Sequence, residues 1–152
     1  MLGGHLLELL VCFQCHDGTD EGRVQAFPAC AHERPPSRPG VVRLPIRGAT
    51  ERLGPPEKVV DLPGTVPDGV AFDAAGNLFI SCYTPDIIFR FSPQGDLKVL
   101  TQDPLHVTLA SPTNIAFCGE DRRTLVCANL GRWHLSKTQM VEPGAPLHYP
   151  MV

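Results

Sequence analysis

Residues 67–82 read Pro67-Asp68-Gly69-Val70-Ala71-Phe72-Asp73-Ala74-Ala75-Gly76-Asn77-Leu78-Phe79-Ile80-Ser81-Cys82, and this stretch decides the fold. Val70 and Phe72 alternate with smaller residues, which predicts a strand over 69–73 with one apolar face. Gly76 tolerates a positive φ and predicts a hairpin turn after that strand. The almost continuous apolar run that follows predicts a strand over 78–83, covered on both faces.

The same pattern returns later in the chain. Pro112-Thr113-Asn114-Ile115-Ala116-Phe117 is followed, after a turn, by Leu125-Val126-Cys127-Ala128. Pro112 stands 45 positions after Pro67 (112 − 67). A second pair, residues 42–45 and 89–93, places Arg43 and Arg90 47 positions apart (90 − 43). A period of about 40–45 residues is typical of a four-stranded β-propeller blade, so the sequence predicts an all-β fold built from such blades.

The blades are too few for a complete propeller. Strands are expected near 69–73, 78–83, 87–92, 97–100, 114–117 and 124–128, and almost no helix is expected after residue 40. Residues 41–152 would supply the outer strands of one blade, one complete blade over about 68–101, and most of another. A propeller closes its ring so that no sheet side stays exposed. The sequence therefore predicts part of a propeller, with about two to three blades.

Composition and charge exclude several classes of protein. The net charge of −3 offers no basic surface to nucleic acid. No run approaches the ~18 apolar residues that span a bilayer. Residues 1–13 also lack the Lys or Arg that opens a secretory leader. The sequence thus predicts a cytoplasmic protein that binds neither nucleic acid nor membrane.

The first 40 residues differ in character from the rest. Residues 16–40 are polar, charged and rich in proline, which excludes a helix. The sequence therefore predicts an irregular or disordered segment over 1–40 and the C-terminal part of a propeller over 41–152.

The six cysteines raise two questions of chemistry. Cys12-Phe13-Gln14-Cys15-His16 has the C-x-x-C-H form of haem attachment, and Cys30 with His32 would complete four ligands for zinc. We expect no haem, because attachment requires export and a helical domain around the macrocycle, and the zinc spacing matches no common module. The roles of Cys12, Cys15 and His16 stay open. The other three, Cys82, Cys118 and Cys127, lie in apolar runs and are expected to be free and buried, which favours a reducing compartment.

Asp68 is the candidate site residue. The innermost strand of a propeller blade starts near the central channel, so a carboxylate at the start of that strand faces an axial site. An Asp-Gly pair is also a common turn dipeptide. The residues alone therefore leave both a structural and a functional role open for Asp68.

Several runs in order resemble the gluconolactonase-like family, which includes senescence marker protein and the luciferin-regenerating enzyme. The similar runs are 67–80, 112–117, 121–125 and 144–147. The resemblance implies a six-bladed propeller with a divalent metal, calcium or zinc, at the channel mouth. It also implies that Asp68 is both a metal ligand and the catalytic base of a lactone hydrolase. The family's other ligands, a Glu and an Asn, belong to blades that this chain lacks.

The resemblance therefore implies a small-molecule lactone as partner and, for this chain, weak or absent metal binding, since one carboxylate cannot hold a hard cation. Asn114 stands at the site's position in the next repeat and is expected to be a turn or lining residue. The alternative is a non-catalytic binding or structural module, or an inactive remnant. Open blade edges would favour self-association. Arg132-Trp133-His134 follows a strand as an edge loop should, and Trp133 is expected to be packed.

Overall fold

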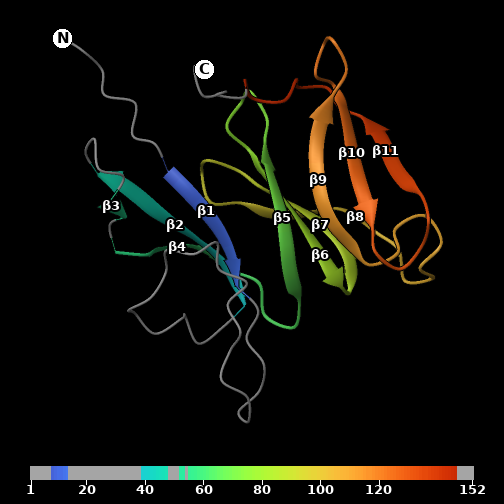
Figure 1. Cartoon of the computed structure of the whole chain (residues 1–152), viewed down its shortest axis with the longest axis horizontal. Coiled ribbons are helices and arrows are strands. Elements are labelled where there is room, and N and C mark those ends of the chain that lie inside the picture. Colours follow the sequence, from blue (N-terminus) through green and yellow to red (C-terminus); the bar gives the residue numbers. More distant parts are fainter. Residues whose placement is uncertain (1–7, 14–38, 48–51, 54, 147–152) are drawn as a thin grey trace. The chain divides into compact units, whose positions relative to one another are not determined.

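The computed structural model describes residues 8–13, 39–47, 52–53 and 55–146, and every helix or strand assigned in them is a β-strand. No helix among these residues is long and apolar enough to cross a membrane. The chain divides into two compact units, residues 1–67 and 68–152, which are described in turn (Figure 1).

The first unit contains a small antiparallel sheet. Its strands are β1 (Glu8–Phe13), β2 (Gly40–Arg47), β3 (Arg52–Leu53) and β4 (Glu57–Asp61). β2 pairs with β1, with β3 and with β4. Val41, Val42 and Leu44 of β2 are buried, while Arg43 between them is exposed.

The irregular segment predicted over 1–40 contains a strand, and the prediction is wrong for residues 8–13. β1 forms because its apolar run pairs in register with β2, for example Val11 with Val42. Its partner stands about thirty positions away, beyond a long polar and proline-rich segment, so nothing local in the sequence marked the pairing. Cys15, His16, Cys30 and His32 lie outside the described residues.

The second unit begins with the predicted complete blade. Its strands are β5 (Val66–Phe72), which starts in the last residues of the first unit, β6 (Leu78–Thr84), β7 (Asp86–Phe91) and β8 (Leu97–Gln102). They form one sheet in the order β5-β6-β7-β8. Gly76 and Gly95 adopt φ values of 81° and 94° in the two outer hairpins, as their places between strands predict. The first five residues of β6 are buried, which confirms a strand covered on both faces.

A second sheet follows, with β9 (Pro112–Cys118), β10 (Thr124–Asn129) and β11 (Leu135–Gln139) in the order β11-β10-β9. The six predicted strands of this unit are all present, and no helix occurs among its described residues. After β11 the chain returns to the sheet that β5, β6, β7 and β8 form. Gly144 bridges Asp73, and the amide of Ala145 donates to the carbonyl of Phe72 over 2.9 Å.

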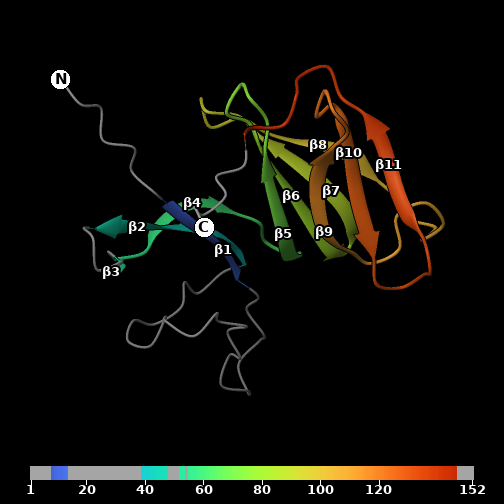
Figure 2. The same ribbon diagram turned by 45° about the horizontal axis from the view of Figure 1, so that its top comes forward.

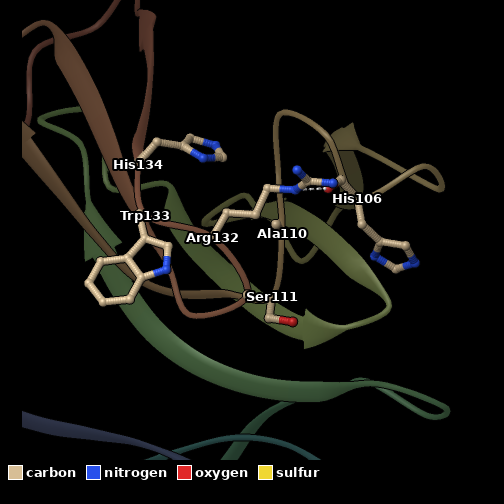
Figure 3. A pocket seen from close by; sticks show the side chains of 7 residues that line it. His106, Ala110, Ser111, Arg132, Trp133 and His134 are labelled. Atoms are coloured by element: carbon tan, nitrogen blue, oxygen red, sulfur yellow. Dashed lines mark hydrogen bonds between the residues drawn. The ribbon is translucent and has the colours of Figure 1, made fainter.

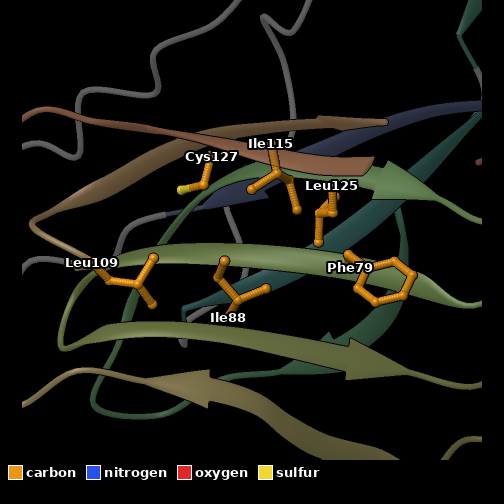
Figure 4. Close-up of a cluster of buried hydrophobic side chains, with 6 residues drawn as sticks. All are labelled: Phe79, Ile88, Leu109, Ile115, Leu125 and Cys127. Atoms are coloured by element: carbon orange, nitrogen blue, oxygen red, sulfur yellow. The ribbon is translucent and has the colours of Figure 1, made fainter. Parts of the chain in front are cut away.

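The two sheets share one hydrophobic core (Figure 4). It consists of Phe79, Ile88, Leu109, Ile115, Leu125 and Cys127. Phe79 of β6 also meets Phe117 of β9 edge to face, with ring centroids 5.5 Å apart. Cys82 and Cys127 are buried and form no disulfide, as expected, and burial raises the pKa of Cys127 to about 11. Cys118 is exposed, contrary to expectation, because it is the last residue of β9, beyond the cover of the opposite sheet.

Alternation of strand direction brings distant segments to one end of the second unit. β5 and β9 begin there, β6 and β10 end there, and the connections β6–β7, β8–β9 and β10–β11 cross it (Figures 1 and 2). We call this the Asp68 end. The candidate site is built on it.

Candidate functional site

Asp68 is the third residue of β5. It lies at the Asp68 end of the sheet that β5, β6, β7 and β8 form. Its side chain is exposed, and no described residue forms a hydrogen bond or ion pair with the carboxylate. Partial burial nevertheless raises the pKa of Asp68 above its ordinary value, because desolvation penalises the charged form and no donor compensates. A carboxylate in this setting is a stronger base than one in water.

Gly69 lets β5 approach β9 closely at this point. A Cβ on Gly69 would lie 2.5 Å from the carbonyl oxygen of Thr113 and 2.9 Å from Oδ1 of Asn114. Buried Ser81 joins the two strands, since its Oγ accepts from the Gly69 amide over 3.1 Å and donates to the Thr113 carbonyl over 2.7 Å. β5 and β9 therefore meet where Gly69, the residue after Asp68, lies against Asn114, and the lining role of Asn114 stays a prediction.

These residues do not fit a calcium or zinc ion by themselves. The described residues contain no cluster of three or more His, Cys, Asp or Glu side chains that could hold a metal. Asp68 contributes one carboxylate and Asn114 one amide oxygen, which already accepts from the Ile115 amide over 2.9 Å. Calcium takes six to eight oxygen ligands and zinc four ligands. No step of the chemistry below is routed through a metal.

A pocket of about 560 Å³ opens at the Asp68 end, between the β8–β9 and β10–β11 connections (Figure 3). Its lining residues are His106, Ala110, Ser111, Gly131, Arg132, Trp133 and His134. Sequence analysis placed the last three in a loop, which is confirmed, but expected a packed indole. Trp133 is fully exposed, because β10 and β11 leave the loop between them projecting beyond the core. His106 and Ser111 were not anticipated.

An aspartate–histidine pair stands at one side of the pocket. Nδ1 of His106 lies 2.6 Å from Oδ2 of Asp86, whose side chain is only 1% exposed. The other oxygen of Asp86 accepts from the Ser111 amide over 3.1 Å. Because the carboxylate accepts, Nδ1 donates, and the imidazole is held with Nε2 directed away from Asp86. The pair thus fixes the orientation of His106.

The β8–β9 connection is ordered by Asp103. Its carboxylate accepts from four backbone amides at 2.6–3.1 Å, those of Leu105, Val107, Thr108 and Leu109. These bonds stabilise the ionised form and lower the pKa of Asp103 to about 2. The Asp103 carboxylate therefore holds the loop that contains His106 in one conformation.

The β10–β11 connection is fastened to the β8–β9 connection. Nε of Arg132 donates to the His106 carbonyl over 2.8 Å, and Nε2 of His134 bonds the Thr108 carbonyl over 3.0 Å. The hydroxyl of Ser136 donates to the same Thr108 carbonyl, and the Gly131 amide donates to Ala110 over 2.9 Å. Both walls of the pocket are thus held together before any ligand binds.

The sequence pointed to Asp68, Asn114 and the Arg132–His134 loop. It did not point to Asp86, Asp103 or His106. Asp86 begins β7 and Asp103 directly follows β8, so the two aspartates lie at the same end of the β7–β8 hairpin. Their positions relative to the predicted hairpin were the signal that could have revealed them. His106 lies in a connection with no pattern of its own, and only the fold brings it to Asp86.

Comparison with known proteins identifies relatives for much of the chain. Residues 37–129 match the family described as SMP-30/Gluconolactonase/LRE-like region. The 6-deoxy-6-sulfogluconolactonase of Pseudomonas putida is 39% identical over 62 residues, which cover 41% of this chain and 20% of that protein. The chain thus matches about a fifth of the length of this curated relative.

Two solved structures resemble the fold. The crystal structure of a nidogen/laminin complex superposes with a TM-score of 0.54 at 20% identity, covering 66% of this chain and 37% of the other. The luciferin-regenerating enzyme superposes with a TM-score of 0.54 at 17% identity, covering 72% of this chain and 41% of the other. These likenesses confirm the all-β, propeller-type fold.

Proposed function

The chain belongs to the SMP-30/gluconolactonase/LRE-like family, and from that premise we propose that it takes part in opening a sugar lactone or a related cyclic ester, with Asp68 as the general base. The observation that carries the proposal is the state of Asp68. It is an exposed carboxylate without a partner among the described residues, and its pKa is raised by desolvation. It stands near the start of β5, at the end of the unit that also carries the pocket. The curated relative is named as a lactonase for 6-deoxy-6-sulfogluconolactone.

The reaction follows from the position of Asp68. The carboxylate removes a proton from a water molecule as the water oxygen attacks the carbonyl carbon of the lactone. The tetrahedral adduct then collapses, the ring C–O bond breaks, and the departing alkoxide takes the proton to give a hydroxy acid. A base contributes most when its pKa lies nearer the working pH, so the raised pKa of Asp68 favours this role.

Substitution of Asp68 tests the proposal. In Asp68→Asn and Asp68→Ala the proton acceptor is gone, so Asp68-dependent ring opening of glucono-1,5-lactone should fall at least about 100-fold, the lower range for a general base. The rate is followed with a pH indicator after subtraction of spontaneous hydrolysis. Asp96→Asn, an exposed aspartate in the β7–β8 hairpin, is the charge-matched control. Full activity in Asp68→Ala, at unchanged melting temperature, would exclude Asp68 as the base.

Metal affinity is a second, separate measurement. Because Asp68 is a single carboxylate, we propose that this chain binds calcium and zinc weakly or not at all. Calorimetric titration of the chain with each ion should give no saturable heat below millimolar concentration. Stoichiometric micromolar binding that disappears in Asp68→Ala would contradict this and would show that the ligands for the ion come from residues of this chain.

A non-catalytic binding module is the alternative, and the preformed pocket beside a single carboxylate favours it. The two functions differ in turnover. A binding module would hold lactone or hydroxy acid with equal affinity in the wild-type protein and in Asp68→Asn, and neither would accelerate hydrolysis.

A further inference from the structure

The pocket at the Asp68 end presents hydrogen-bond donors and positive charge. Arg132 contributes a guanidinium, and His106 and His134 contribute imidazoles, while no acidic side chain is among the lining residues. Two acids of the adjoining segments are already engaged. Asp86 is buried against His106 and the Ser111 amide, and Asp103 accepts four backbone amides of its own loop. The pocket is thus complementary to a negative group.

Arg132 is positioned for a planar, two-oxygen acceptor. Its Nε donates to the His106 carbonyl, so the side chain lies across the pocket toward His106 (Figure 3). The two terminal nitrogens form no bond with any described residue. Carboxylate, sulfonate and phosphate groups match this fork of donors, which lysine cannot reproduce.

The backbone around the pocket is held in an uncommon conformation. His106 and Ser111 have φ values of 54° and 53°, a region that residues with a side chain rarely adopt. The Asp103 carboxylate and the bonds between the two connections maintain it. Strained residues that the surrounding structure enforces cluster at ligand sites. A preformed pocket of this kind loses little conformational entropy when it binds.

The pocket also lies close to Asp68. Gly69, the neighbour of Asp68, lies against Thr113, and Ser111 of the pocket precedes β9, two residues before Thr113. Two residues of extended chain span at most about 7 Å. Asp68 and the pocket therefore lie at the same end of the unit, joined by the contact between β5 and β9.

We propose that the pocket is a subsite for an anionic substituent, a carboxylate, sulfonate or phosphate ester, carried by the lactone whose ring carbonyl is placed at Asp68. The inference rests on the proposed function for the identity of the substrate as a lactone. Arg132 binds two oxygens of the anion, His106 donates or accepts at Nε2, and the exposed indole of Trp133 covers the sugar. Arg132 thereby selects acidic over neutral lactones.

Trp133 makes the binding half directly measurable, because it is the single tryptophan of the chain. Fluorescence of the full chain is titrated with D-glucarate, which carries a carboxylate at C6, with 6-phospho-D-gluconate, and with the uncharged analogue sorbitol. None of these compounds is a lactone, so the result does not depend on hydrolysis. The two acids should change the emission saturably, sorbitol should not, and the affinities of the two acids show which anionic group is preferred.

Arg132→Gln removes the fork of donors and should weaken binding of the acids at least about tenfold. Lys98→Gln, an exposed residue of β8, changes the net charge equally and should leave the affinity within a factor of two. Arg132→Lys keeps the charge without the planar fork, and its affinity for the acids should lie between those of Arg132→Gln and Lys98→Gln. It serves as the test if Arg132→Gln is poorly folded. Equal affinity for sorbitol, or equal loss in Arg132→Gln and Lys98→Gln, would overturn the subsite.

Rates on two substrates separate this inference from the proposed function. The ratio of kcat/KM for 6-phosphoglucono-lactone to that for glucono-lactone should fall at least about tenfold in Arg132→Gln. Asp68-dependent hydrolysis of both lactones with an unchanged ratio would overturn the subsite and leave the proposed function standing. Arg132-dependent binding of the acids without hydrolysis of either lactone would overturn the proposed function and support the anion site.

Discussion

At the scale of single residues, two aspartates of one unit illustrate how surroundings determine role. Asp68 has no donor from the described residues, and desolvation raises its pKa. Asp103 accepts four backbone amides, and these hold its pKa at about 2. The first is a stronger base than an ordinary aspartate. The second is suited to remain ionised and to order the loop that carries His106.

The pH dependence of the loop follows from the Asp103 pKa. Since the pKa in the folded protein is below the ordinary value of 3.8, the stabilisation by Asp103 is complete above that value and is lost as pH falls toward about 2. In Asp103→Asn, amide exchange of residues 105–109 at pH 6 should accelerate at least about tenfold, because local opening becomes easier.

Melting temperatures give the sign of this effect. The wild-type protein should melt above Asp103→Asn at pH 6, and the difference should shrink between pH 4 and pH 2 because the wild-type carboxyl becomes protonated there. Asp96→Asn, whose side chain is exposed in the β7–β8 hairpin, is the control. A difference that stays constant down to pH 2 would show that Asp103 acts through its shape and not through its charge.

The residue scale also shows what the sequence could predict. Asp68 was found because Pro67-Asp68-Gly69 is a local motif at a recognisable strand start. His106 was not, because its role depends on Asp86, twenty positions away, and on a positive φ that the sequence does not encode by a glycine. Trp133 was mispredicted for a related reason. A large apolar residue usually packs, and only the fold shows that this one projects at a pocket rim.

At the scale of elements, the contact between β5 and β9 determines the site. Gly69→Ala would place a methyl group 2.5 Å from the Thr113 carbonyl oxygen, so the strands must separate and the bonds of Ser81 must stretch. We expect a loss of about 1–3 kcal/mol in the free energy of unfolding, which is the usual effect of overpacking. Urea denaturation measures it, and lactone hydrolysis should fall as well, because Asp68 moves away from Asn114.

Gly95→Ala is the matched control for this change. Gly95 has a φ of 94° and open space around it, so an alanine there is strained but displaces no neighbour. Its stability should fall by about 1 kcal/mol, the lower range for a residue forced to a positive φ, while hydrolysis stays unchanged. If Gly69→Ala lowered stability without lowering hydrolysis, the β5–β9 contact would be structural only.

Elements were predictable in proportion to their local pattern. β6 reads as a continuous apolar run between turn residues, and β9 repeats β5 after one blade period, so both were located within a few residues. β11 was not located, because its side chains are largely exposed and show no apolar alternation. β1 was missed because a strand that pairs with a distant partner needs no turn beside it.

At the scale of the whole molecule, large apolar side chains are exposed in β11 and in the segments that precede and follow it. Leu130, Leu135 and Val141 are 75%, 68% and 82% exposed. Among the described residues, β11 pairs with β10 alone, so its outer backbone edge has no partner strand there. An edge strand with free amide and carbonyl groups is a template for another strand. We infer that this edge drives self-association of the chain.

Leu135→Lys tests the role of that edge. A charged side chain on an edge strand opposes strand pairing, which is how natural sheets avoid edge-to-edge contact. The wild-type chain should show a sedimentation coefficient that rises with concentration, and Leu135→Lys should weaken the association at least about tenfold. Leu105→Lys is the matched control, because Leu105 is 78% exposed but lies in the β8–β9 connection and not in a strand. If both variants weakened association equally, exposed apolar surface in general and not the β11 edge would be responsible. If the wild-type chain sedimented as a monomer at all concentrations, the edge would be protected by other means.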